Sequence, residues 1–456
     1  MNLLKNQPPN LTAGSLWSNI WAMSWPMFLI MIFNFLVGLA DIYVAGLISA
    51  GVQAAVGFIS QLFFLTIIVA NAISIGTLAL ISRAAGAGNH ELSVEISKQS
   101  LILSLLIAIG LTFIGLAFHR EIIAMAGFPD EIKEISENFL KVYALSLGPN
   151  YILIVSNAIF RATGEIKKPL LSMFLVSLIN VIGDFVLVFG IFPFPRLGYI
   201  GIAVSTAISV AIGTSVNLIF FSVMRWRSLY SRPLKISTAK IKKIISLGWP
   251  AALLQIAWNA GSIILYNILA RLGQESIAAM ASLTNGLRIE AIIYLPAFAL
   301  NMAASVLIGQ NLGAGNSTRA ERIGWHIAFA GAALISFMAI IIFIWAEHVA
   351  SVFTRNLAVL EETTRYLRIN MLSEPFMALS AVLGGGLQGA GDTKGTMWII
   401  VIAMWLIRLP LAYMLALALD YGATGVWIAM ITSMAVQGIL MTWRFHKGHW
   451  KELRLD

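Results

Sequence analysis

The sequence predicts an all-α membrane protein in which twelve transmembrane helices form two pseudo-symmetric six-helix bundles. Hydrophobic residues make up 59% of the 456 residues, against about 45–50% in soluble domains. Charged residues make up only 11%, and the mean hydropathy is +0.85. The apolar stretches are long and uniform, as membrane helices of about 20 residues require, and they lack the short alternating pattern of barrel strands.

Polar or Gly/Pro-rich segments separate the twelve apolar stretches. We expect the spans at 17–46, 53–82, 94–118, 137–161, 169–192, 199–224, 243–271, 278–309, 320–345, 363–388, 396–418 and 423–444. An even number of spans places both termini on the same side of the membrane.

Basic residues indicate which side that is. Lys and Arg concentrate after even-numbered spans, most densely in "MRWRSLYSRPLKISTAKIKK" at 224–243 and in the tail "RFHKGHWKELRLD". The positive-inside rule therefore places both termini in the cytoplasm of a protein of the cell inner (plasma) membrane. The same bias accounts for the net charge of +9, so we expect the lipid bilayer and no nucleic acid as a partner.

The two halves of the chain repeat one another. "LISRAAGAGN" at 80–89 returns as "LIGQNLGAGN" at 307–316, and "FRATGEIKKP" at 160–169 is matched by "LQGAGDTKGT" at 387–396. The pairs Trp25-Pro26 and Trp249-Pro250, and Gly201 and Gly425, recur at nearly the same offset. Ordered matches of this kind indicate a duplication.

The duplication predicts a domain organisation and a class of function. We expect a first bundle at 1–224, a cytoplasmic linker at 225–242 and a second bundle at 243–456. Parallel repeats in membrane proteins usually place a substrate path between the halves. The architecture therefore favours a transporter over a channel or a purely structural bundle.

Residue types argue against an enzyme and against a cofactor. Cys is absent, which excludes thiol catalysis and Cys-ligated metals. The six histidines form no metal-ligand spacing, and no GxxxxGK[ST] phosphate loop occurs. The "GAGN" at 86–89 follows a predicted helix, where a nucleotide fingerprint needs a strand.

Two membrane-embedded acids in the first half are the candidate ion-coupling residues. A charge at membrane depth costs at least about 2.5–3.5 kcal/mol, so it usually faces a cavity or a partner. Asp184 follows Asn180 by one turn, and both Asp41 and Asp184 fall in the outer half of their spans. The alternative is that the two acids only hydrogen-bond neighbouring helices together.

Oxygen ligands around these acids would extend the site. Thr206 and Asn157 could add ligands to Asp41, Asn180 and Asp184, and hard oxygen ligands suit Na⁺ as they suit Ca²⁺ or Mg²⁺. Carboxyl groups alone suffice for H⁺. We expect H⁺ coupling, with Na⁺ at Asp41, Asn180 and Asp184 as the alternative, and no other cofactor.

The second half lacks an equivalent acid pair. At an offset of 224, Arg408 corresponds to Asp184 and Leu265 to Asp41, so we expect the coupling site in the first half. Arg288 and Glu290 are two residues apart and do not face each other on a helix. Glu290 is expected either in a structural salt bridge, with Arg408 as its candidate partner, or in the substrate cavity. The candidate cavity residues are Asn34, Gln255, Asn259, Asn285, Glu290 and Arg288.

Proline 26 interrupts the first span fifteen residues before Asp41. Because proline removes a backbone hydrogen bond, it tends to kink a helix. We expect Pro26 to be a hinge that moves Asp41 relative to Asp184, and a static kink is the alternative.

The motifs together resemble those of the multidrug and toxic compound extrusion (MATE) family. The matching features are "AAGAGN" after span 2, "GQNLGAGN" after span 8, "GAGDTK" after span 10 and the basic loop between two six-span halves. The resemblance implies two bundles around a V-shaped cavity. It also implies export of amphiphilic, often cationic drugs or dyes driven by inward H⁺ or Na⁺. We expect the protein to act as a monomer.

The resemblance is greatest to the DinF-like branch of that family. Pro26, Asp41, Asn180 and Asp184 match the pattern of this branch, whereas Trp258 stands where another branch has an acid and Val37 where some relatives have tyrosine. A related lipid-linked oligosaccharide flippase is the alternative function. Such a protein would carry several cavity arginines for a pyrophosphate, for which only Arg288 and Arg408 are candidates here.

Overall fold

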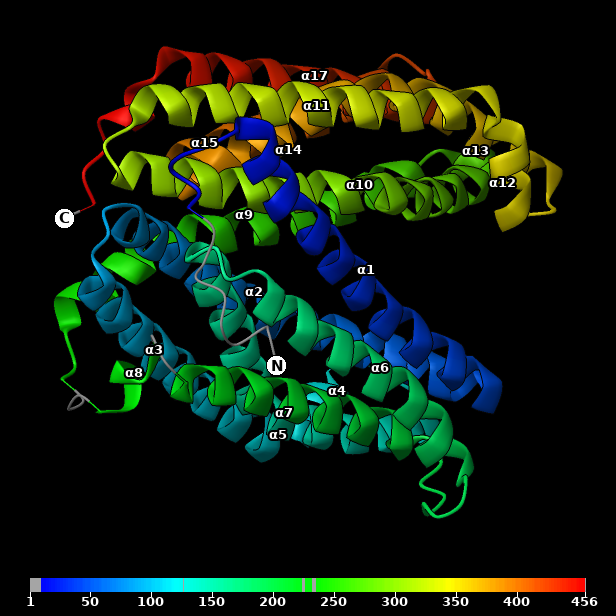
Figure 1. Ribbon diagram of the computed structural model, residues 1–456. Coiled ribbons are helices and arrows are strands. Elements are labelled where there is room, and N and C mark those ends of the chain that lie inside the picture. Colours follow the sequence, from blue (N-terminus) through cyan, green and yellow to red (C-terminus); the bar gives the residue numbers. More distant parts are fainter. Residues whose placement is uncertain (1–9, 126, 224–225, 232–234, 456) are drawn as a thin grey trace. The chain divides into compact units, whose positions relative to one another are not determined.

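Helices account for the regular structure in the computed structural model, which describes residues 10–125, 127–223, 226–231 and 235–455; no strand occurs among these residues (Figure 1). The helices of the first half are α1 (Leu16–Ile48), α2 (Ala50–Gly86), α3 (His90–Ala117), α4 (His119–Ala124), α5 (Asp130–Ala162), α6 (Lys167–Phe189), α7 (Ile200–Ser222) and α8 (Ser228–Ser231). Those of the second half are α9 (Thr238–Ala270), α10 (Ser276–Gly313), α11 (Ser317–Ile344), α12 (Ala346–Phe353), α13 (Leu357–Asn370), α14 (Glu374–Ala390), α15 (Thr393–Val401), α16 (Leu409–Tyr413) and α17 (Gly422–Lys447).

The helices form two compact units. The first unit consists chiefly of Trp25–Trp249, and the second of Leu11–Ser24 with Pro250–Asp456. In the first unit, α2 packs against α5, α5 also packs against α3 and α7, and α6 packs against α7. In the second unit, α10 packs against α14 and α11, and α14 packs against α11 and α17. Of the predicted linker at 225–242, residues 225 and 232–234 lie outside the described residues. The last residues of the predicted linker belong to α9, which begins at Thr238.

Eleven helices are long and apolar enough to cross a membrane among the residues that the structure describes. The predicted tenth span, 363–388, differs because it is broken: α13 and α14 are joined by a 3₁₀ turn at Met371–Ser373. The reason is local, since Pro375 follows Glu374 at the first turn of α14, where its missing N–H is tolerated. The expectation of one regular helix over this stretch was therefore wrong.

The predicted eleventh span, 396–418, is continuous but irregular. After α15 it passes through a π-helical segment at Ile402–Arg408, then α16, then a second π-helical segment at Met414–Ala418. Pro410 lies inside this stretch and cannot donate a backbone hydrogen bond. Wider π-type turns are found mostly as short insertions in helices, frequently at functional sites.

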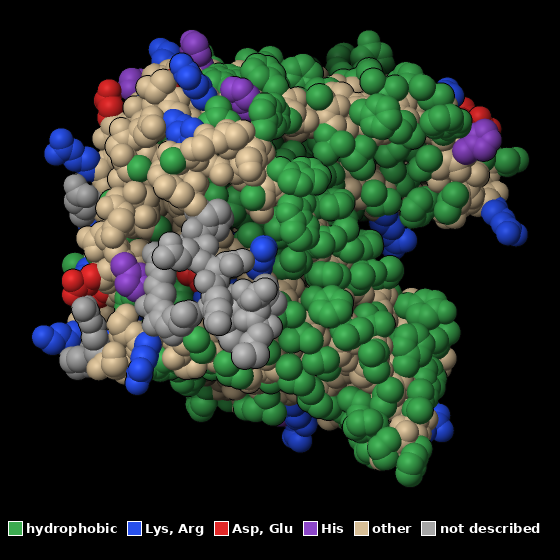
Figure 2. All heavy atoms as spheres, in the orientation of Figure 1, with side chains coloured by type: hydrophobic (Ala, Val, Ile, Leu, Met, Phe, Trp, Pro, Cys, Tyr) green, Lys and Arg blue, Asp and Glu red, His purple; other side chains and the backbone are tan. Residues whose placement is uncertain are grey.

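The surface of the helices is what a lipid environment requires. Trp21, Phe113 and Leu406 are 70%, 69% and 69% exposed, which in water would leave large apolar side chains unburied. Hydrophobic side chains cover the long helices on the face drawn in Figure 2, and charged side chains gather at helix ends. The fold is that of an all-α membrane protein.

The repeated "GAGN" motif builds the same turn in both halves. Gly88 and Gly315 have φ of +71° and +74°, a conformation that only glycine adopts without strain. The asparagine that follows caps the next helix: Asn89 Oδ1 accepts from Leu92 N at 2.9 Å, and Asn316 Oδ1 accepts from Arg319 N at 3.1 Å. The motif is thus a helix stop followed by a helix start.

The repeated glycines 201 and 425 allow two helices to touch. A Cβ atom on Gly201 would lie 2.8 Å from Val188 N, and one on Gly425 would lie 2.7 Å from Ala416 N. Both glycines lie in the first turn of the last long helix of their half. They let that helix start directly against the backbone of the preceding one.

The two Trp-Pro pairs mark where α1 and α9 pass from one unit to the other. The unit boundaries fall at Ser24/Trp25 and at Trp249/Pro250. The first segment of the chain is held in the second unit, where Asn311 Nδ2 donates to Leu11 O at 3.2 Å. The start of α9 packs in the first unit, where a Cβ on Gly248 would lie 2.2 Å from Ala72 O. Each unit therefore contains a segment from the other half.

We expect Gly201→Ala and Gly425→Ala to destabilise the protein, because the added methyl group would meet backbone atoms that cannot rotate away. Overpacking of this kind costs about 1–3 kcal/mol. The measurement is the temperature at which monodisperse protein is lost in detergent. Gly110→Ala is the control, since its Cβ would meet nothing within 4 Å. A transition temperature that falls equally in all three variants would contradict the close-contact argument.

Candidate functional site

Four predicted residues meet inside the first unit. Asp41 comes from α1, Asn180 and Asp184 from α6, and Thr206 from α7. Their exposed fractions are 6%, 0%, 0% and 7%, in the same order. Asn180 and Asp184 are one helical turn apart, so both side chains lie on the same face of α6. The structure thus brings the acids of two distant spans into one buried cluster.

The Asn180 amide joins the other members of the cluster. Its Nδ2 donates to Asp41 Oδ1 at 3.2 Å and to Thr206 Oγ1 at 3.1 Å. Thr206 Oγ1 in turn lies 3.4 Å from Asp41 Oδ2. Because a carboxylate only accepts hydrogen bonds, the NH₂ group of Asn180 must face Asp41. Its carbonyl oxygen then points elsewhere.

Three buried acceptor oxygens of the cluster receive no hydrogen bond within the described part of the chain: Asn180 Oδ1 and both oxygens of Asp184. The Asp41 and Asp184 carboxyl groups lie within hydrogen-bonding reach of each other. Two carboxylates cannot hydrogen-bond unless one carries a proton. Buried acceptors without donors are costly. The site therefore fits a shared proton or a small cation.

A close approach of α6 and α7 sets the geometry of the cluster. A Cβ on Gly183 would lie 2.5 Å from Ser205 Oγ. Ser205 Oγ donates to the backbone oxygen of Asn180 at 2.9 Å. This contact fixes the register of the two helices and places Thr206 beside the Asn180 side chain. Sequence reasoning missed Gly183 and Ser205, although small residues at helix interfaces are a general signal.

Tyr143 on α5 is a further residue that the sequence argument did not find. It is 3% exposed, interacts electrostatically with Asp41 and lies within hydrogen-bonding reach of Thr206. No tyrosine stands one turn before Asp41, where the chain has Val37. A phenol therefore approaches the site from a different helix. Its span, 137–161, contains several other polar residues, so no signal in the sequence singled out this tyrosine.

Asn157 lies in a separate polar network. Its Oδ1 accepts from Ser172 Oγ at 3.2 Å and from Asn217 Nδ2 at 2.8 Å. Ser172 precedes Asn180 by about two turns of α6. Among the described residues, Asn157 makes no hydrogen bond to either aspartate. The network connects α5, α6 and α7.

The remaining predicted residues of the first span are placed differently from Asp41. Asn34 is exposed, and its Nδ2 donates to Ile30 O at 2.9 Å. Pro26 lies inside α1, two residues after the unit boundary. Asn34 and Asp41 thus share a helix, but only Asp41 faces the interior of the unit.

The predicted cavity residues of the second unit do not form one cluster. Gln255, Asn259 and Asn285 are half-buried, and Asn259 Nδ2 donates to Gln255 O at 2.8 Å. Arg288 is exposed, whereas Glu290 is 3% exposed. The prediction that Arg288 and Glu290 face away from each other agrees with this placement.

Two tyrosines donate hydrogen bonds to the two carboxyl oxygens of Glu290. Tyr366 Oη donates to Glu290 Oε1 at 2.8 Å, and Tyr294 Oη donates to Glu290 Oε2 at 3.0 Å. Within the described residues no ion pair joins Glu290 to Arg408, although the two interact electrostatically. The expected direct salt bridge is thus replaced by phenol hydrogen bonds. Tyr294 lies four residues after Glu290 on α10, a spacing that the sequence shows.

Arg408 stands where the first half has Asp184. Its Nε donates to Ser433 Oγ at 2.7 Å, and its guanidinium lies 5.0 Å from the centre of the Trp258 ring. Glu374, 1% exposed, has an Oε2 that receives no hydrogen bond from a described donor. The second unit therefore surrounds its acids with phenols and a cation, and the first unit surrounds its own with amides and hydroxyls.

Comparison with known proteins identifies the family to which this fold belongs. The MatE family profile matches residues 26–186 and 250–414, one segment in each half. The probable multidrug resistance protein NorM of Thermotoga maritima is 27% identical over 458 residues, covering 99% of this chain and 97% of the relative. The uncharacterized transporter YisQ of Bacillus subtilis is 24% identical, covering 95% and 94%.

Solved structures show the same fold. A MATE protein crystallised in a bent conformation has a TM-score of 0.88 at 21% identity, covering 97% of this chain and 99% of that one. A MOP superfamily transporter from Pyrococcus furiosus has a TM-score of 0.85 at 20% identity, covering 98% and 100%. With both halves matched by one family profile and the whole fold shared, the chain belongs to the MatE (MATE) family of membrane transporters.

Proposed function

We propose that the protein is a secondary active multidrug efflux antiporter of the inner membrane, which exports amphiphilic cationic compounds in exchange for H⁺. Relatives named as probable multidrug resistance proteins support the substrate class. The buried Asp41–Asn180–Asp184 cluster carries the coupling part of the proposal. We also assign the protein to the DinF-like branch, because Pro26, Asp41, Asn180 and Asp184 match its pattern.

The cluster supports coupling because it can exist in two charge states. With one shared proton, the two acids form a hydrogen bond and repel each other little. Without it, two carboxylates face each other in a site that is almost closed to water, and like charges at this distance repel strongly. A cationic compound relieves that repulsion, and a proton does the same. The two therefore compete for one site.

Asn180 and Thr206 act in this proposal as positioning residues. They hold Asp41 through hydrogen bonds of 3.2 and 3.4 Å, so that a change in the charge of Asp184 acts on a fixed partner. Pro26 is proposed as the hinge through which α1 responds, because a proline leaves the helix without one of its backbone hydrogen bonds. We propose Asn157 as an outer ligand that acts through its network with Ser172 and Asn217.

H⁺ is favoured over Na⁺ by the donor set. The oxygens free to ligate a cation among the described residues are Asn180 Oδ1 and the two oxygens of Asp184. Asp41 is already held by Asn180 and Thr206. Three free oxygens suit a shared proton better than a sodium ion, which we keep as the alternative coupling ion at Asp41, Asn180 and Asp184.

The flippase alternative finds less support in the arginines. Arg408, one of the two candidates for gripping a pyrophosphate, is 4% exposed and engaged by Ser433 and Trp258. Arg288 is exposed, but it stands alone on its face of α10. A pyrophosphate carries several negative charges, and a single exposed arginine would not balance them.

Expression in a drug-sensitive bacterium is expected to raise tolerance to lipophilic cations such as ethidium by at least about fourfold and to lower dye accumulation. The physical reason is the acidic site in an apolar bundle, which attracts such cations. Growth in graded ethidium and cell-associated fluorescence are the measurements. If tolerance and accumulation stay unchanged while the protein is shown to be in the membrane, the flippase function becomes the better proposal.

Asp41→Asn and Asp184→Asn are each expected to reduce coupled dye export to the background of empty vesicles, because an amide cannot carry the exchanged proton. Both variants keep side-chain size, so folding should be retained. Glu290→Gln is expected to lower the amount of folded protein instead, since the phenol donors lose an ionic acceptor at a cost of about 1–3 kcal/mol. The exposed Glu347 supplies the control variant, Glu347→Gln. Normal export by both aspartate variants would exclude the first-unit site.

Everted vesicles separate the two coupling ions. At constant Na⁺, collapse of the imposed ΔpH is expected to stop dye transport, because the shared proton is then no longer exchanged. Imposing ΔpNa alone should leave transport below about a tenth of the proton-driven rate. Transport that survives without ΔpH and stops without Na⁺ would replace H⁺ by Na⁺ at the same residues. Transport that ignores both gradients would remove Asp41 from the coupling role.

A further inference from the structure

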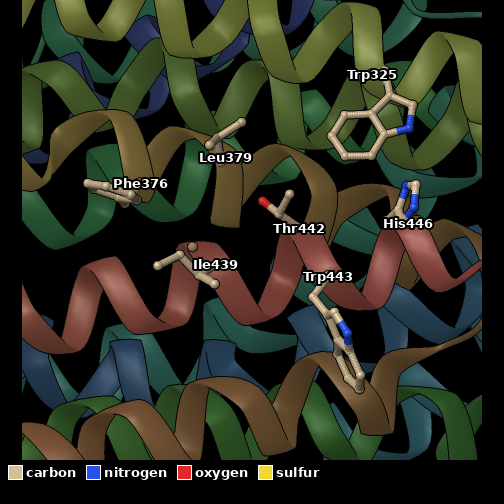
Figure 3. A pocket seen from close by; sticks show the side chains of 8 residues that line it. Trp325, Phe376, Leu379, Ile439, Thr442, Trp443 and His446 are labelled. Atoms are coloured by element: carbon tan, nitrogen blue, oxygen red, sulfur yellow. The ribbon is translucent and has the colours of Figure 1, made fainter.

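A groove of about 420 Å³ opens on the second unit between α11, α14 and α17. Trp325 of α11, Phe376 and Leu379 of α14, and Ile439 and His446 of α17 are among its lining residues (Figure 3). Its volume is in the range of about 300–1,000 Å³ found for small-molecule sites. Its lining includes none of the residues proposed for ion coupling and none of the predicted cavity residues.

Helix packing explains why a groove forms here. A Cβ on Gly438 would lie 2.7 Å from Phe376 O, so α14 and α17 touch at this point. Beyond the contact, Ile439 and Trp443 of α17 are 58% and 55% exposed and form an open wall. In a membrane helix, an exposed apolar wall faces lipid chains. The groove is therefore open to the hydrocarbon of the bilayer.

One polar atom of the lining is unsatisfied. Thr442 Oγ1 is buried and has no hydrogen-bond partner among the described residues, although a helical threonine can usually bond to the carbonyl four residues earlier. Figure 3 shows Thr442 on the same stretch of α17 as His446, opposite Trp325. The hydroxyl therefore lies behind the wall of the groove, and the surface that the groove offers to a ligand is apolar along this stretch.

The groove ends at a basic rim. His446 lies beside Trp325, with ring centres 6.4 Å apart, and Lys447 Nζ lies 4.8 Å from the centre of the Trp443 ring. Arg322 precedes Trp325 by one turn of α11. Figure 2 shows basic and histidine side chains gathered over the start of α11 and the end of α17. Tryptophans next to cations are typical of a membrane–water interface.

Acids near this rim are already paired. Asp392 accepts two hydrogen bonds from Arg444, at 2.6 and 2.8 Å, and Glu321 pairs with Lys451 at 2.7 Å. No ion pair is formed by Arg322 or Lys447 within the part of the chain that the structure describes. The rim therefore keeps a positive charge that an anion would neutralise, and it repels the cations that the transporter is proposed to carry.

We infer that this groove binds one anionic glycerophospholipid of the adjoining leaflet. Its acyl chain would lie along Phe376, Leu379 and Ile439, and its phosphate would lie at the basic rim to which Arg322 and Lys447 contribute. Basic pockets between transmembrane helices on the cytoplasmic side suit the headgroups of anionic lipids. The inference rests on the membrane fold and goes beyond the proposed export activity, because it needs neither the coupling site nor a drug substrate.

Lipid retention on the full-length protein tests the inference. Purified protein is exposed to equal amounts of phosphatidylglycerol and phosphatidylethanolamine with matched acyl chains, and native mass spectrometry counts the lipids retained. We expect one phosphatidylglycerol to be retained in preference. Arg322→Gln with Lys447→Gln should lower this retention at least about fivefold, since each basic residue near the membrane surface contributes to the attraction. Both side chains are exposed, so folding should be unaffected.

Two further variants separate charge from shape. Arg227→Gln with Lys242→Gln removes two exposed cations from the first unit and should leave retention unchanged. Leu379→Trp should fill the groove and lower the retention of both lipids. Equal retention of the two lipids by the wild type, or an equal loss in both double variants, would overturn the inference. Displacement of phosphatidylglycerol by ethidium would also overturn it, because the groove would then belong to the drug route.

Discussion

A buried acceptor without a donor is costly, and the side-chain amide of Asn180 supplies a donor to the buried Asp41 carboxyl group of the first unit. Its two N–H groups connect Asp41 of α1 with Thr206 of α7, so one residue on α6 holds three helices around the acids. The junction in turn depends on close helix packing. Gly183 and Ser205 bring α6 and α7 close enough for it to form, and Asp184 lies next to it without a donor among the described residues.

The two halves show how a duplicated fold divides its functions. Both keep the turn glycines, the asparagine caps and the close helix starts, because these features build the backbone. The interiors have diverged instead. The first unit holds two buried acids beside oxygens that accept no hydrogen bond from the described residues, whereas the second has Arg408 where Asp184 would be and covers Glu290 with phenols. A symmetrical scaffold thus carries an asymmetrical pair of charge sites.

The sequence could predict much of this structure because hydropathy and spacing act locally. Apolar length located the spans, and the one-turn spacing of Asn180 and Asp184 predicted their shared face. Contacts between distant helices were harder to predict. Tyr143 and Tyr366 approach Asp41 and Glu290 from helices that no spacing connects to them, and the break at Met371–Ser373 depends on a proline whose effect is conformational. The separate position of Asn157 has the same origin, since its partners lie on two other helices.

The exchange of short segments at the two Trp-Pro pairs has a consequence for synthesis. The start of α9 packs against α2 in the first unit, next to Ala72 and Gly76, yet the ribosome produces it only after more than half of the chain. The segment around Leu11 can complete its packing only later still, because its hydrogen-bond partner Asn311 is synthesised after α9. Neither half can complete its own packing while it is the only half present. The chain is therefore committed to folding as one polypeptide, and a gene split between its two repeats would yield two incomplete parts.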